Sequence, residues 1–147
     1  MIQTILVALD SSARAPAVLA AACEIAEKFG ARLAPVRTIS VPPDFPPAAH
    51  VVGHDPLPAH LKDVALAELD LLLAAVPAGV AMDAPRVRIG QPWRTIIEAA
   101  EELNADLVVL GSHGYHGADR ILGTTAGKVA NLCKRNVLVV HVAGAAP

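Results

Sequence analysis

Residues 106–125 read DLVVLGSHGYHGADRILGTT. The opening DLVVL, residues 106–110, is a short and mostly apolar run, which is typical of a strand buried on both faces of a parallel sheet. A glycine-rich turn follows, and the apolar spacing beyond it predicts a helix over residues 124–133. This order of buried strand, glycine-rich turn and helix indicates an α/β protein with a parallel sheet.

The rest of the chain repeats this alternation. Strands are expected at residues 2–9, 31–39, 84–89 and 137–142, and helices at residues 12–29, 61–76 and 93–103. Ser11 or Ser12 is expected to cap the first helix and Gly30 to end it, while the six prolines of residues 41–58 predict a loop. Right-handed connections then predict an open, twisted five-stranded parallel sheet in the order 3-2-1-4-5 with helices on both faces, a Rossmann-like α/β fold.

Composition narrows the functional classes. With 147 residues, 54% of them hydrophobic and 18% charged, the chain is expected to form a single domain over residues 1–147. A net charge of −2 gives no basic surface for nucleic acid, and no apolar run reaches the ~20 residues that span a membrane. The start of the chain has no signal-peptide pattern, so a cytoplasmic location is expected.

No metal site is expected from the sequence. Cys23 and Cys133 fall within helical patterns and have no metal-binding or disulfide spacing, so they are interpreted as core residues. His50 and His54, in the proline-rich loop, also fit no recurring ligand pattern.

A ligand site is expected at the carboxyl ends of the first and fourth strands, because ligands bind such sheets where the winding direction reverses. Asp10 follows the first strand and Gly111 the fourth, so the two are expected to face each other. Gly123, Thr124 and Thr125 begin the next helix, where free N–H groups and hydroxyls favour a phosphate. The alternative is that these glycines serve only a tight turn. Neither a Walker A loop nor a dinucleotide fingerprint is present.

The chain resembles the universal stress protein family, whose ATP-binding members carry glycine, two residues, glycine, nine residues, then glycine with serine or threonine. GSHG, residues 111–114, matches the first half, and Gly123-Thr124 matches the second after eight residues in place of nine. A nine-residue register would instead put Thr124 and Thr125 at the last two positions. The resemblance extends over nearly the whole chain and includes ILVALDSS at residues 5–12, LAPVRTI at residues 33–39 and the closing NVLVVHV.

The resemblance implies a set of nucleotide-binding residues and a fold like that of the adenine nucleotide alpha hydrolases. Asp10 matches the family aspartate near the ribose and adenine, and Val36 matches an apolar residue beside the adenine. The ribose and phosphate loop corresponds to Gly111, Gly114, Gly123 and Thr124, and Thr125 follows as a further phosphate donor. Independently of the resemblance, His113 in this loop is interpreted as a solvent-facing histidine that contacts a phosphate. The alternative for Asp10 is a helix N-cap.

The implied function is that of an ATP-binding regulatory protein of the stress response, holding ATP with or without Mg²⁺. The alternatives are a nucleotide-free protein-interaction module of the same fold and a slow Mg-dependent ATPase. No catalytic residue is assigned, because the sequence offers no strong candidate to orient an attacking water. The family often dimerises through its last strand, and the apolar residues 137–142 at a sheet edge predict a homodimer of this kind.

Overall fold

Five parallel strands lie at the centre of the structure in the order β3-β2-β1-β4-β5. The computed structural model describes residues 1–40, 56–112 and 124–142. The strands are β1 (Thr4–Ala8), β2 (Arg32–Ile39), β3 (Arg86–Ile89), β4 (Leu107–Gly111) and β5 (Asn136–Val140). The predicted fold class and strand order are confirmed.

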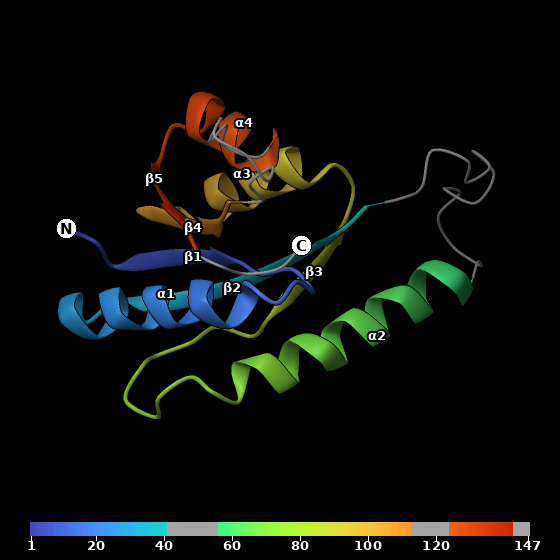
Figure 1. Ribbon diagram of the computed structural model, residues 1–147, viewed down its shortest axis with the longest axis horizontal. Coiled ribbons are helices and arrows are strands. Elements are labelled where there is room, and N and C mark those ends of the chain that lie inside the picture. Colours follow the sequence, from blue (N-terminus) through green and yellow to red (C-terminus); the bar gives the residue numbers. More distant parts are fainter. Residues whose placement is uncertain (41–55, 113–123, 143–147) are drawn as a thin grey trace.

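Two helices cover each face of this sheet. α1 and α2 lie on one side and α3 and α4 on the other, so the molecule has three layers (Figure 1). The helices are α1 (Ala15–Phe29), α2 (Pro56–Leu73), α3 (Pro92–Glu102) and α4 (Thr124–Leu132). None of the helices in the described ranges has the length and apolar character needed to cross a membrane.

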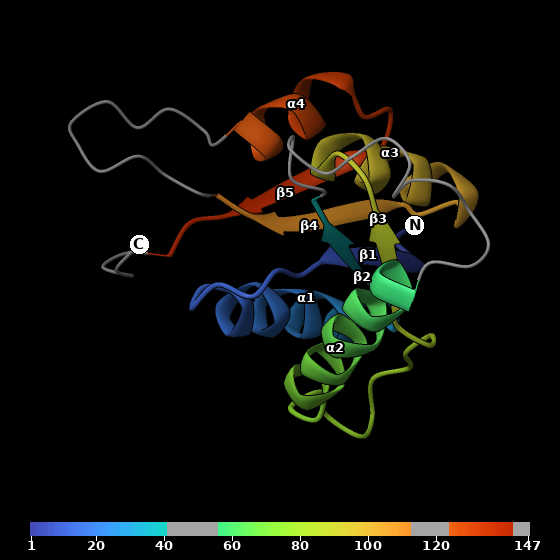
Figure 2. The same ribbon diagram turned by 90° about the vertical axis from the view of Figure 1, so that its right-hand side faces the viewer.

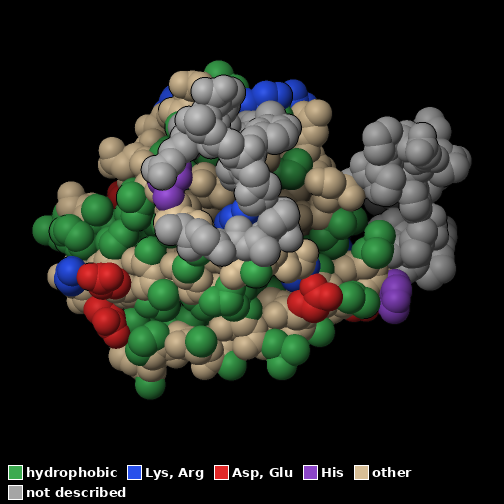
Figure 3. All heavy atoms as spheres, viewed as in Figure 1, with side chains coloured by type: hydrophobic (Ala, Val, Ile, Leu, Met, Phe, Trp, Pro, Cys, Tyr) green, Lys and Arg blue, Asp and Glu red, His purple; other side chains and the backbone are tan. Residues whose placement is uncertain are grey.

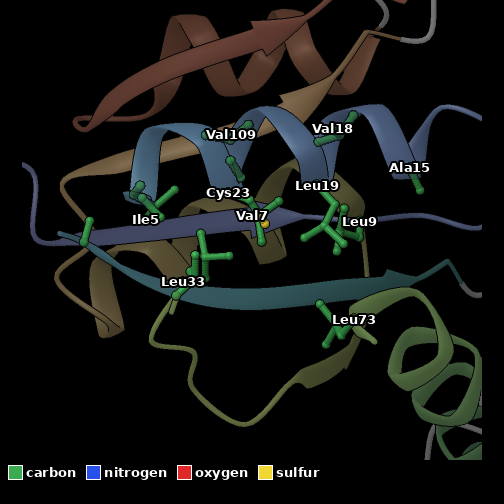
Figure 4. Packing of buried hydrophobic residues seen from close by; sticks show 14 of the residues in the cluster. Ile5, Val7, Leu9, Ala15, Val18, Leu19, Cys23, Leu33, Leu73 and Val109 are labelled. Atoms are coloured by element: carbon green, nitrogen blue, oxygen red, sulfur yellow. The ribbon is translucent and has the colours of Figure 1, made fainter. Parts of the chain in front are cut away.

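The central strands β1, β2 and β4 bury both of their faces, because each layer of helices packs on its own apolar cluster. Along β1, Ile5 and Val7 face the α1 side, whereas Leu6 belongs to the cluster under α3 and α4. Side chains of α1, among them Leu19 and Cys23, pack against β1 and β2 (Figure 4). The continuous apolar runs in the sequence follow from this two-sided burial.

α1 begins at Ala15, so the predicted start at residue 12 is wrong by three residues. The backbone N–H of Ser12 donates to Asp10 Oδ1 at 2.8 Å, and that of Arg14 donates to Ser12 Oγ at 3.2 Å. These local bonds hold the segment in turns and delay the helix. At the other end, Gly30 has a φ of 62° and closes the helix as predicted.

α2 begins at Pro56, so the loop expected over residues 41–58 is wrong for its last three residues. Proline is tolerated there because the N–H groups of the first helical turn have no partner within the helix. Residues 41–55, the remainder of the expected loop, lie outside the described residues.

α2 buries only a narrow apolar stripe. Ala65, Leu69 and Leu73, spaced four residues apart, are buried against the sheet. Leu71 is 80% exposed, and Val64 is 44% exposed. Hydrophobic side chains therefore appear on the outer surface of the α1 and α2 layer (Figure 3). Scattered exposed leucines are common on protein surfaces and do not by themselves mark an interface.

Candidate functional site

A cleft of about 350 Å³ opens at the carboxyl ends of β1 and β4. The first turn of α1, the end of β4 and the start of α4 all lie at this side of the sheet (Figure 2). The cleft is lined by Ala8, Leu9, Asp10, Ser11, Ser12, Val36, Thr38, Ser40, Pro92, Ile96, Leu110, Gly111 and Thr125. Strand-end residues lie together here because parallel strands all finish at the same edge of the sheet.

One wall of the cleft is apolar. Val36 from β2, Ile96 from α3 and Leu110 from β4 are all at most 5% exposed. Because these three elements pack together on the α3 and α4 side, their side chains form a continuous surface on which a flat, apolar ring could lie. Val36, which the resemblance places beside an adenine, lines this wall.

Asp10 lies in the turn between β1 and α1 and lines the cleft. Its carboxylate accepts a hydrogen bond from the Ser12 N–H, which holds the side chain at the end of the strand. The N-cap residue of α1 is Arg14, so the alternative that Asp10 is the helix N-cap is wrong. Of the described residues that line the cleft, Asp10 is the one with an acidic or basic side chain.

Gly111, the last residue of β4, lines the same cleft as this turn. It also has a packing role, because a Cβ atom at this position would lie 2.9 Å from Cγ2 of Val18 on α1. Real Cβ atoms essentially never come so close to another heavy atom. The glycine therefore lets α1 approach the end of β4 and so brings the first turn of α1 to the cleft.

The start of α4 forms the other polar side of the cleft. Thr124 begins this helix, and the half-buried Thr125 lines the cleft from its first turn. The backbone N–H groups of a first turn lack partners within the helix and favour an anion. His113, Gly114 and Gly123, the other expected loop residues, lie outside the described residues.

Several lining residues were missed in the sequence. Thr38 lies two residues after Val36 on the same face of β2, so strand periodicity could have indicated it. Pro92 and Ile96 belong to α3, and no local pattern in the sequence places that helix against the end of β2. In the described ranges, no three His, Cys, Asp or Glu side chains gather as metal ligands.

Comparison with known proteins identifies the family of this chain. The model of the universal stress protein family matches residues 1–141. The chain belongs to the universal stress protein family. Universal stress protein A homolog 1 of Coxiella burnetii is 32% identical over 139 residues, which cover 92% of this chain and 94% of the relative. Universal stress protein Sll1388 of Synechocystis is 32% identical over 149 residues, which cover 93% of this chain and 96% of the relative. Membership of the family supports a role in the stress response.

Solved universal stress proteins have the same fold. Universal stress protein UspA from Lactobacillus plantarum superimposes with a TM-score of 0.70 at 26% identity, covering 95% of this chain and 97% of that one. A universal stress protein crystallised in complex with cAMP has a TM-score of 0.65 at 28% identity, with the same coverage of 95% and 97%.

Proposed function

We propose that this chain binds ATP in the cleft between β1 and β4 and acts as a nucleotide-responsive regulatory protein of the stress response. The observation that carries this proposal is the composition of the cleft. A single opening of about 350 Å³ combines an apolar wall with a polar end that includes the first turn of a helix. A nucleotide needs both surfaces, one for its base and one for its phosphates.

The base would lie against Val36, Ile96 and Leu110, where apolar surface leaves water on binding. The ribose would lie beside Asp10, whose carboxylate can accept hydrogen bonds from the two ribose hydroxyls. The phosphates would then extend past Gly111 to Thr125 and the first turn of α4. The cAMP complex of a related universal stress protein supports an adenine nucleotide as the ligand class.

The described lining favours binding over hydrolysis. Asp10 is the one carboxylate among the described lining residues, and it already accepts the Ser12 N–H. If Mg²⁺ enters with the phosphates, phosphate oxygens and water would be its ligands, because the ribose engages the Asp10 carboxylate. The same carboxylate could not also orient an attacking water, so we expect tight occupancy with slow turnover.

Binding is tested first without any variant. The protein is purified and denatured, and the supernatant is analysed by chromatography for released ATP, ADP or AMP. Calorimetric titration of nucleotide-free protein with ATP, with and without Mg²⁺, then measures the affinity. Material that carries no nucleotide and gives no heat with adenine nucleotides would reject the proposal and favour the nucleotide-free interaction module.

A matched pair of variants locates the site. Thr125→Val removes the hydroxyl from the first turn of α4, and we expect ATP affinity to fall about tenfold, the loss of one hydrogen bond to a charged group. Thr4→Val makes the same change at the buried amino end of β1, far from the cleft, and is expected to leave ATP affinity unchanged. Equal effects of the two variants would place the nucleotide elsewhere.

We also propose that two copies pair through β5. β5 is an edge strand in the described sheet, and its sequence, NVLVV, carries no charge. The opposite edge strand, β3, contains Arg86 and Arg88, and charged side chains of this kind discourage strand pairing. The two edges are therefore unequal, and the uncharged one is suited to a two-fold contact with a second copy.

A further inference from the structure

Two threonine hydroxyls meet at the base-binding end of the cleft. Thr38 Oγ1 on β2 lies 2.7 Å from Thr95 Oγ1 on α3, which is a hydrogen-bond distance. Thr38 lines the cleft, whereas Thr95 is only 7% exposed and lies behind it. Each hydroxyl has one proton to donate, so the direction of this bond determines what Thr38 can offer to a ligand.

The surroundings of Thr95 favour one direction of this hydrogen bond. Thr95 Oγ1 lies 3.2 Å from the Gln91 carbonyl oxygen and 3.1 Å from the Pro92 carbonyl oxygen. Carbonyl oxygens can only accept, so the proton of Thr95 is directed to the first turn of α3. With the Thr95 proton used in this way, we infer that Thr38 is the donor in the 2.7 Å contact and Thr95 the acceptor.

Thr95 is also held in place by packing. A Cβ atom at Gly90 would lie 2.9 Å from Cγ2 of Thr95, which means that the backbone before α3 closely approaches this methyl group. The methyl on one side and the two carbonyl oxygens on the other leave the Thr95 side chain little freedom to turn. The acceptor that receives the Thr38 proton is therefore fixed before any ligand arrives.

We propose that Thr38 is a specificity-determining residue that selects a purine with an amino group at position 6 over one with a carbonyl there. This inference rests on the proposed nucleotide function. Because the Thr38 proton is committed to Thr95, its oxygen can only accept from the cleft. An exocyclic amino group donates to such an oxygen, whereas a carbonyl oxygen in the same position is left facing another acceptor and unpaired.

The position of Thr38 fits this role. It lies two residues after Val36 on the same face of β2 and lines the same cleft, beside the wall that would hold the base. Thr95 does not line the cleft. It acts through Thr38 and is a positioning residue.

The test compares ATP with inosine triphosphate, which carries a carbonyl in place of the 6-amino group. Calorimetric titrations of the wild-type protein are expected to give at least about tenfold tighter binding of ATP, since an unpaired buried polar group costs about 1–3 kcal/mol. In Thr38→Val the affinity for ATP should fall about tenfold with little change for inosine triphosphate, which brings the ratio close to one. Thr38→Ser keeps the hydroxyl and should keep the ratio.

Thr95→Val gives the sharpest readout. It removes the fixed acceptor, so the Thr38 hydroxyl can turn and donate to a carbonyl. We expect inosine triphosphate to bind more tightly than it does to the wild type while ATP binding changes little, a result that simple loss of structure would not produce. Thermal unfolding of each variant checks the fold. If Thr95→Val fails to fold, the comparison of Thr38→Val with Thr38→Ser still tests whether the Thr38 hydroxyl determines the preference for ATP.

Equal affinities of the wild type for the two nucleotides, or an ATP preference that survives in Thr38→Val, would overturn the assignment of Thr38 while leaving nucleotide binding intact. Absence of binding by either nucleotide would instead reject the proposed function, and this inference with it.

Discussion

At the residue scale, Gly111 connects the packing of the core to the cleft. Its missing side chain lets Val18 of α1, itself only 3% exposed, approach the end of β4. We expect Gly111→Ala to lower the free energy of unfolding by about 1–3 kcal/mol, the usual cost of forcing an extra methyl into a packed site. Urea denaturation measures this change.

A double variant identifies the cause. Val18→Ala removes the methyl that the new Cβ would meet at 2.9 Å, so Gly111→Ala should cost much less in that background than in the wild type. If its cost is the same in both backgrounds, the contact with Val18 is not the reason for the glycine.

Asp106 gives a residue-scale prediction of pH dependence. Its carboxylate accepts hydrogen bonds from the backbone N–H groups of Gln3 and Thr4, both at 2.9 Å, and these bonds lower the pKa of Asp106. A pKa that is depressed in the folded state stabilises the protein above the unfolded-state pKa of about 3.9, and this stabilisation is lost as the pH falls through the folded-state value.

We therefore expect the wild type to exceed Asp106→Asn in free energy of unfolding at pH 7, and this difference to shrink as the pH is lowered towards 2. Other acidic groups titrate in both proteins and cancel in the difference. Urea denaturation at a series of pH values measures it, and a difference that is constant with pH would contradict the role given to these two hydrogen bonds.

At the scale of elements, the end of α1 depends on Gly30, which has a φ of 62°. A Cβ there would have no heavy atom within 4 Å, so any cost of alanine comes from the backbone conformation alone. We expect Gly30→Ala to reduce the free energy of unfolding by about 1 kcal/mol, measured by urea denaturation.

Gly79 provides the matched control. A Cβ at Gly79 also has open space around it, but the φ of Gly79 lies outside the left-handed region. Gly79→Ala should therefore be neutral or slightly stabilising, because alanine restricts the unfolded chain. Equal costs at the two positions would mean that the left-handed conformation is not what requires Gly30.

At the scale of the whole molecule, the proposed pairing through β5 predicts a change of assembly in Leu138→Lys. Leu138 is 37% exposed on the edge strand, whereas its neighbour Val139 packs against the cluster beneath α3 and α4. Two copies of a new lysine would face each other near the two-fold axis, so light scattering should report a monomer in place of a dimer.

Leu71→Lys is the control for this experiment. It makes the same change at a residue of α2 that is 80% exposed and lies away from β5, and the dimer mass should be retained. A wild type that is already monomeric, or a Leu138→Lys variant that remains dimeric, would count against pairing through this edge.

The sequence predicts well the features that depend on contacts within one helix or strand, and less well those that depend on contacts between distant residues. Apolar periodicity places nearly every strand and helix, because it reflects burial within one element. Predicted boundaries are wrong where side chains compete with the backbone, as at Ser12, or where proline fits a first turn, as at Pro56. In the site, Asp10, Val36, Gly111 and Thr125 lie around one cleft, as parallel strands lead one to expect.

The order of elements, the parallel sheet and the edge at which the cleft opens were determined by sequence alone, because buried strands and short right-handed connections allow few other arrangements. Only the tertiary structure decided which side chains meet across elements. Thr38 and Thr95 are 57 residues apart in the chain, and Gly111 is closed in by a methyl group from α1. Such contacts depend on how the helices pack against the sheet, and the periodicity of a single element does not contain that information.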